Sequence, residues 1–258
     1  YKITGDEFAR ETALLAADNL KSRFRKKGQF IQAWGELDLK ENYRLIIDCL
    51  LNLPILYWAA DITGDSSYRD VAEKHLATTR KVIYRPDYST HHTYYFDVET
   101  GKPAYGATKQ GYSDESTWSR GQAWGVYGLM LNYMYVKDDT IPDEWKKVTD
   151  YFLRHLPEDK VAYWDFHYRD GKEPRDSSAS AIAVCGICDE NYLTQAYEIL
   201  ENLAKLYAAP ENDEMNGILL HSTYGRLLGD GIDECCLFGD YFYMEALMRV
   251  LRPEFRTY

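Results

Sequence analysis

One aspartate lies inside an apolar stretch where a charged side chain is out of place. Asp48 sits within Leu45–Leu51, whose other members are aliphatic residues and one cysteine. Charged side chains are almost never fully buried without a partner or a purpose. Burial raises the pKa of a carboxyl group, which is what a general acid at neutral pH needs. Asp48 is therefore a candidate acid/base catalyst, and a structural aspartate that completes an internal hydrogen-bond network is the alternative.

A cation stands near the predicted start of a helix, where the helix dipole disfavours positive charge. This residue is Arg120, in a helix that opens near Ser116. A guanidinium group matches a carboxylate in bidentate fashion, so Arg120 is a candidate ligand for an anion. A salt bridge to Asp114 or Glu115 is the alternative.

Aromatic residues are abundant, with 23 Tyr and 6 Trp. Both types join a flat face to a polar edge, which suits carbohydrate clefts, although a large helical core explains the composition equally well. Trp34 lies outside any predicted helix, where it either stacks on a sugar or plugs a loop. His91 and His92 precede a predicted hairpin, and such surface-loop pairs are more often inert than functional.

Charge and cysteine content exclude several classes of protein. The net charge of −11 argues against nucleic acid and anionic membrane surfaces as partners, while an anionic small substrate needs cationic groups in its pocket. No apolar run approaches the roughly 20 residues that span a bilayer. The five cysteines include a C-x-x-C at Cys185 and Cys188, but no second Cys pair or His cluster completes a zinc site, so buried thiols are favoured. We expect no metal and no cofactor.

The elements that position these residues are helices. Periodicity predicts eight of them, over about 4–25, 42–61, 66–83, 117–136, 143–156, 176–189, 191–208 and 239–251. Four stretches are apolar nearly all round: Leu45–Ala60, Trp118–Tyr135, Ser177–Cys188 and Tyr241–Leu251. The stretches between them carry charges on one face, as expected of helices that face water. This alternation predicts an all-α toroid over residues 1–258, one domain with an inner and an outer ring, and an irregular solenoid of hairpins is the alternative.

Two non-helical segments precede inner helices. Thr93–Asp97 alternates and is followed by Glu99–Lys102, which predicts a short hairpin. Val161–Tyr168 predicts another strand. Because loops at one end of a scaffold usually carry binding residues, we expect the functional site there.

Six short motifs occur in order at suitable spacing: Gln32–Gly35, Ile46–Pro54, Trp118–Trp124, Tyr163–Phe166, Arg175–Ala181 and Gly239–Tyr241. Together they resemble the unsaturated glucuronyl hydrolases of glycoside hydrolase family 88, over essentially the whole chain. The resemblance implies a bacterial (α/α)6 barrel that removes a 4,5-unsaturated uronic acid from the non-reducing end of glycosaminoglycan oligosaccharides by hydrating the double bond. It implies that Asp48 protonates C4 and assists a water that adds at C5. The family's substrate-contacting positions fall on Trp34, His92, Gln110, Arg120 and Trp124.

The chain departs from the family in two respects. The family has a further aspartate in an upstream His-His-Asp motif, and eight helices fall short of six hairpins. We therefore expect that roughly two N-terminal hairpins are absent from this sequence, that the first helix exposes an apolar face, and that self-association follows. The second departure is Lys109, where the family commonly places a histidine, and a lysine there still favours an anionic substrate. The compartment stays open between bacterial cytoplasm and periplasm.

Three alternatives accompany this interpretation. The related unsaturated rhamnogalacturonyl hydrolases share the toroid and the aspartate, but the Asn52–Pro54 continuation favours the glucuronyl enzymes. A toroidal sugar isomerase or epimerase would use two histidines on inner helices, whereas His75 and His155 fall on predicted outer helices and the other four histidines fall in loops. A non-catalytic carbohydrate-binding toroid is the third alternative.

Overall fold

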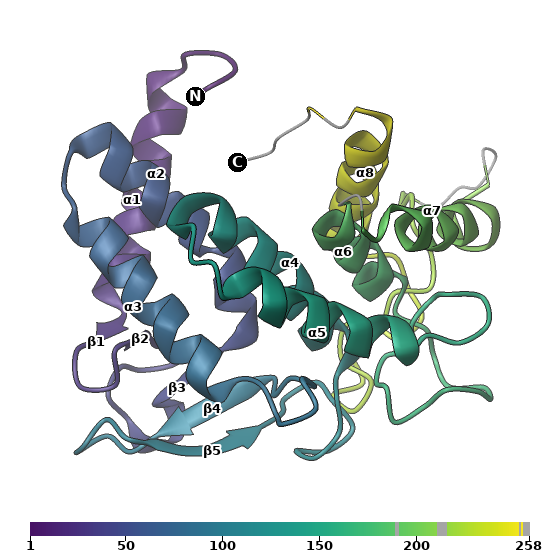
Figure 1. Ribbon diagram of the computed structural model, residues 1–258, viewed down its shortest axis with the longest axis horizontal. Helices are drawn as coiled ribbons and strands as arrows, with labels where there is room; N and C mark the ends of the chain where they lie inside the picture. Colours follow the sequence, from purple (N-terminus) through teal and green to yellow (C-terminus); the bar gives the residue numbers. More distant parts are fainter. Residues whose placement is uncertain (189–190, 211–215, 253, 255–258) are drawn as a thin grey trace.

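Helical hairpins make up most of the computed structural model, which describes residues 1–188, 191–210, 216–252 and 254 (Figure 1). The described residues contain all eight predicted helices, and the predicted last residue of the sixth, 189, lies outside them. The helices are α1 (Glu7–Ser22), α2 (Leu53–Thr63), α3 (Ser67–Val82), α4 (Ser119–Val136), α5 (Ile141–Arg154), α6 (Ser177–Ile187), α7 (Leu193–Asn202) and α8 (Leu237–Leu251). A π-helical turn, Leu203–Tyr207, extends α7.

The predicted alternation of inner and outer helices is confirmed. Inner helix α4 packs against α6, and α6 packs against α8, while α3, α5 and α7 cover α2, α4 and α6 from outside. Every residue of α6 is buried. The contact between α4 and α6 is close because Gly186 has no side chain: a Cβ there would lie 2.7 Å from the Cα of Tyr127. The chain thus has the inner and outer layers of an α/α toroid.

The helix predicted over 42–61 is wrong in its first half. Arg44–Ile46 forms strand β3, Ile47–Leu51 forms a 3-10 turn (η2), and α2 begins only at Leu53. Pro54 explains the late start, because proline lacks an N–H and is tolerated only in the first turn of a helix. Asp48 therefore lies in a tight turn between a strand and a helix, not within an inner helix.

A three-stranded antiparallel sheet lies at one end of the helical layers (Figure 1). The order is β3–β4–β5, with β4 at Thr93–Phe96 and β5 at Pro103–Ala107, so the predicted hairpin is confirmed. A smaller pair joins β1 (Phe24–Arg25) to β2 (Phe30–Ile31). The register of β3 on β4 sets Ile46 opposite Thr93, which brings the η2 turn next to the residues that precede β4.

The strand predicted over Val161–Tyr168 is absent. This segment makes only isolated bridges, from Asp165 to Trp118 and from Tyr163 to Arg175. Its residues from Val161 to Phe166 are all buried. The sequence pattern therefore reflects burial on both sides of an irregular segment, and no neighbouring strand in the described part of the chain pairs with it.

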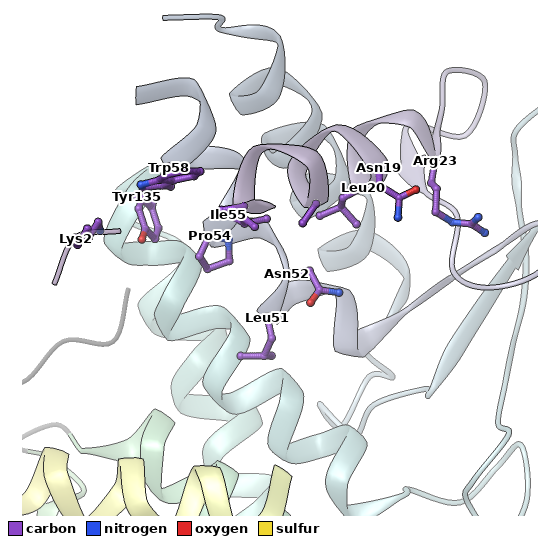
Figure 2. A pocket seen from close by; sticks show the side chains of 12 residues that line it. Lys2, Asn19, Leu20, Arg23, Leu51, Asn52, Pro54, Ile55, Trp58 and Tyr135 are labelled. Atoms are coloured by element: carbon purple, nitrogen blue, oxygen red, sulfur yellow. The ribbon is translucent and has the colours of Figure 1, made fainter. Parts of the chain in front are cut away.

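An apolar cavity of about 550 Å³ lies between α1, α2 and the end of α4. Figure 2 shows its lining side chains, which include Leu20 of α1, Ile55 and Trp58 of α2, and Tyr135 of α4. Helix α1 also exposes Phe8 and Leu15, with 76% and 69% of their surfaces accessible. The expected apolar face of the first helix is thus present. No described helix is long and apolar enough to cross a membrane.

Candidate active site

The seven residues that the sequence singled out line one cavity of about 550 Å³. They are Trp34, Asp48, His92, Lys109, Gln110, Arg120 and Trp124. The remaining wall consists of Ile46, Trp118, Tyr224, Leu228 and Phe238. Sequence reasoning missed these five as site residues. Ile46 and Trp118 belong to two of the family motifs, and this membership could have identified them. Tyr224 and Leu228 lie in an irregular loop that contains no such motif.

Asp48 is placed beside His92 by the backbone. The Ile47 N–H donates to the His92 carbonyl at 3.1 Å, and Asp48 Oδ2 lies 3.9 Å from His92 Nε2. The Asp48 side chain is 34% accessible, through the cavity that it lines. Burial raises the pKa of Asp48 to about 6, against weaker opposing effects of its own backbone amide, Arg120 and Trp124. Near neutral pH, Asp48 can therefore both hold and release a proton, as an acid/base catalyst must.

His92 is neutral, and its Nε2 faces Asp48 from beyond hydrogen-bond distance. Burial, with the positive charges of Arg120, Arg44 and Lys109, lowers the pKa of His92 to about 3. Its Nδ1 accepts a hydrogen bond from the backbone N–H of Lys109 at 3.1 Å. A neutral imidazole has one donor and one acceptor nitrogen, so the proton is on Nε2, the atom that faces Asp48.

Three polar atoms of the cavity wall are buried and make no hydrogen bond of good geometry within the described part of the chain, although the indole N–H of Trp124 lies near enough to Asp48 to help lower its pKa. They are Asp48 Oδ2, His92 Nε2 and Trp124 Nε1. Buried polar groups in proteins are nearly always hydrogen-bonded, and exceptions require an explanation. One acceptor and two donors from three separate parts of the chain therefore define a place for a polar ligand.

Arg120, predicted to bind an anionic ligand, already makes an ion pair and hydrogen bonds within the protein. The proposed alternative partners were wrong, because its Nη1 pairs with Asp176 and also donates to the Thr223 carbonyl at 2.7 Å. Its Nη2 donates to the Tyr224 carbonyl at 2.7 Å. The guanidinium also lies 4.6 Å from the ring centroid of Trp118. Arg120 thus holds the Thr223–Tyr224 backbone against the cavity and supplies positive charge there.

Lys109, Gln110 and Trp34 differ in how they are held. Gln110 Nε2 donates to the Tyr224 carbonyl at 2.6 Å, so this carbonyl accepts from both Gln110 and Arg120. Lys109 forms no ion pair with any residue that the structure describes. Trp34 is 41% accessible, and the guanidinium of Arg44 lies 4.3 Å from its ring centroid. The open face of Trp34 and the charge of Lys109 are therefore available to a ligand.

Known proteins resemble this chain over nearly its whole length. The model of Glycosyl Hydrolase Family 88 matches residues 1–230. The "Unsaturated chondroitin disaccharide hydrolase" of Streptococcus pneumoniae (strain ATCC BAA-255 / R6) is 48% identical, over 96% of this chain and 66% of the relative. The chain therefore spans 66% of the length of this relative.

Solved structures agree with the sequence comparison. A crystal structure of an unsaturated glucuronyl hydrolase from Streptococcus agalactiae matches with a TM-score of 0.92 and 47% identity, over 98% of this chain and 67% of that one. A mutant of the S. agalactiae enzyme complexed with dGlcA-GalNAc6S matches with a TM-score of 0.83 and 40% identity, over 100% of this chain and 67% of that one. From the family match over residues 1–230 and the 48% identity, we conclude that this chain belongs to glycosyl hydrolase family 88.

Proposed function

We propose that the protein releases a 4,5-unsaturated uronic acid from the non-reducing end of glycosaminoglycan oligosaccharides, with Asp48 as its acid/base catalyst. The observation that carries this proposal is the set of three buried polar atoms without a hydrogen bond of good geometry, on Asp48, His92 and Trp124, in a cavity with an aromatic wall. The relatives support the substrate class, since they include a protein named unsaturated chondroitin disaccharide hydrolase and an enzyme structure in complex with dGlcA-GalNAc6S.

The chemistry is the addition of water across the C4=C5 double bond of the uronate. Protonated Asp48 delivers its proton to C4, and its carboxylate then accepts a proton from the water that adds at C5. The hemiketal formed at C5 opens, and the glycosidic bond is lost. A pKa of about 6 suits this cycle, because both forms of Asp48 are populated near neutral pH. This single carboxylate differs from the paired carboxylates of ordinary glycosidases, which flank the scissile bond.

The other cavity residues bind and orient the sugar. The Nε2–H of His92 and the indole N–H of Trp124 donate hydrogen bonds where substrate or water meets Asp48. Lys109 offers a positive charge for the uronate carboxylate, and Arg120 adds to the local positive potential. A protein of net charge −11 needs such a local field to attract an anion. Trp34 provides an accessible face on which a sugar ring stacks.

Replacing Asp48 with asparagine tests the mechanism. We expect Asp48→Asn to lower kcat by about 10²–10⁴-fold or more, because one carboxylate performs both proton transfers. The assay follows the loss of absorbance of the unsaturated uronate in chondroitin- and heparin-derived disaccharides. Asp61→Asn is a matched control, since Asp61 is a surface residue at the far end of α2 that pairs with Arg69 at 3.3 Å. A folded Asp48→Asn enzyme with a near-normal rate would show that Asp48 is not the catalyst.

A further inference from the structure

The segment from Thr108 to Ser116 carries two residues of the cavity but contains no helix or strand. Several hydrogen bonds within the segment shape it, including bonds between Ser113 and Ser116. The Thr108 N–H donates to Asp114 Oδ1 at 2.7 Å, and the Gly111 N–H donates to Thr108 Oγ1 at 2.8 Å. Its first residues continue strand β5, whose Ala107 pairs with Thr93. Beyond that point no ladder of backbone hydrogen bonds fixes the segment, so its position also depends on side chains from elsewhere.

Asp165 supplies such side-chain contacts from a remote part of the chain. Its carboxylate is completely buried. Oδ2 accepts from the Tyr112 N–H at 2.9 Å and from Ser116 Oγ at 2.8 Å, while Oδ1 accepts from the His167 N–H at 2.9 Å. All three partners are donors, so they suit a carboxylate, which only accepts. Desolvation by burial raises the pKa of Asp165, and these bonds oppose that shift.

Arg85 holds the same segment by its carbonyls. Its Nη2 donates to the Asp114 carbonyl at 2.6 Å and to the Ser116 carbonyl at 3.0 Å. Asp165 therefore accepts hydrogen bonds from the Thr108–Ser116 segment, and Arg85 donates hydrogen bonds to its carbonyls. Neither side chain lines the cavity. Asp165 lies within the Tyr163–Phe166 motif, but no role was predicted for it from the sequence, and Arg85 belongs to none of the motifs.

The held segment in turn controls His92. The Lys109 N–H is the donor to His92 Nδ1, and this bond assigns the imidazole proton to Nε2, opposite Asp48. Without that donor, either ring nitrogen of the neutral imidazole can carry the proton. The Gln110 side chain, which reaches the Tyr224 carbonyl, depends on the same segment.

We propose that Asp165 is a positioning residue of the active site: by fixing the Thr108–Ser116 segment, it keeps the Lys109 N–H on His92 Nδ1 and the imidazole proton on Nε2, toward Asp48. The effect on turnover rests on the proposed function, whereas the effect on the His92 tautomer does not. Asparagine cannot satisfy all three donors. With its one oxygen toward Tyr112 and Ser116 its NH₂ group faces the His167 N–H, and with its oxygen toward His167 its NH₂ group faces the Tyr112 N–H.

The test measures the tautomer and the rate separately. Side-chain ¹⁵N NMR reports which ring nitrogen of each neutral histidine is protonated, and a His92→Gln variant assigns the His92 signals. In the wild-type protein we expect protonated Nε2 and unprotonated Nδ1. In Asp165→Asn we expect a mixture of both tautomers. We also expect kcat to fall by up to about 10²-fold, because small displacements of catalytic groups have effects of that size.

Two further variants make the result decisive. Asp159→Asn is the control, because Asp159 lies in the same part of the chain and accepts from Arg175 and Tyr207 without contacting the Thr108–Ser116 segment. It should leave the His92 tautomer and kcat unchanged. Ser116→Ala removes one donor to Asp165, together with the hydroxyl that accepts from the Ser113 N–H. It should shift the tautomer in the same direction as Asp165→Asn, and it provides the test of the segment's role if Asp165→Asn does not fold. An unchanged His92 tautomer in folded Asp165→Asn or Ser116→Ala protein would overturn the proposal. If the wild-type protein has no hydrolase activity but the variants shift the His92 tautomer, the positioning role is supported and only the proposed function is refuted.

Discussion

Replacing Asp48 with asparagine should stabilise the fold at neutral pH even as it removes activity. Burial raises the pKa of Asp48 from 3.8 to about 6. Between these two values the folded protein holds a proton that the unfolded chain has released. The free energy of unfolding therefore falls as pH rises through this window, and it stays lower above pH 6. The asparagine side chain of the variant has no titrating proton, so Asp48→Asn does not suffer this loss.

The size of the effect follows from the shift. A shift of about two pKa units corresponds to about 3 kcal/mol at 1.36 kcal/mol per unit. The Asp48 side chain is 34% accessible, and solvent screening reduces this value to about 1–3 kcal/mol. For a chain of this size, each kcal/mol shifts Tm by about 2–4 °C.

Urea unfolding followed by circular dichroism at pH 4.5, 6 and 8 measures this difference. The gain of Asp48→Asn over the wild type should be small at pH 4.5 and full at pH 8. Asp138→Asn is the opposite control: hydrogen bonds from Thr140 and Arg80 lower the pKa of Asp138 to about 2, so its loss should destabilise the protein, most of all above pH 4. A pH-independent difference between Asp48→Asn and the wild type would refute the reasoning.

Two more predictions concern charge and surface. Lys109→Met should raise KM for an unsaturated disaccharide and make KM less sensitive to salt, with the free energy of unfolding unchanged. Arg120→Met should have the same effect on KM and should also lower the free energy of unfolding by about 3–5 kcal/mol, because it leaves Asp176 buried without its cation. Steady-state kinetics at two salt concentrations and urea unfolding check both variants, and equal stability of the two would contradict this division of roles. Because Phe8 and Leu15 are largely exposed on α1, we predict that the protein self-associates through this face and that Phe8→Glu lowers its apparent mass in size-exclusion chromatography; a wild-type protein that elutes as a monomer would contradict this.

The helices could be predicted because burial leaves a periodic record in the sequence. α4 and α6 are apolar on every side, and α5 carries a charged stripe, so their layers followed directly. The boundaries near Asp48 could not be predicted from periodicity, since a buried strand, a 3-10 turn and a buried helix all produce the same apolar run. Pro54 was the one local signal that α2 starts late, and the hydrophobic pattern obscured it.

The cavity was predictable where its residues belong to recognisable motifs. Asp48, Arg120 and Trp124 were found in this way, and the structure places them in one cavity with the other predicted residues. The ion pair of Arg120 was not predictable, because Asp176 is 56 residues away and only the packing of α4 against α6 brings them together. Tyr224 accepts hydrogen bonds through its backbone carbonyl. Every residue has this group, so the amino-acid type at position 224 does not predict the contact.

The Tyr224 carbonyl joins parts of the chain that are synthesised at different times. It accepts hydrogen bonds from residues 114 and 104 positions earlier, Gln110 and Arg120. Contacts between residues so far apart in sequence form late, because the loop between them must first be closed. During synthesis from the N-terminus, α2 to α5 leave the ribosome before Tyr224 does. Arg120 therefore gains its partner Asp176 first and the Tyr224 carbonyl later, and we expect the cavity wall to be complete only when the segment before α8 has packed against it.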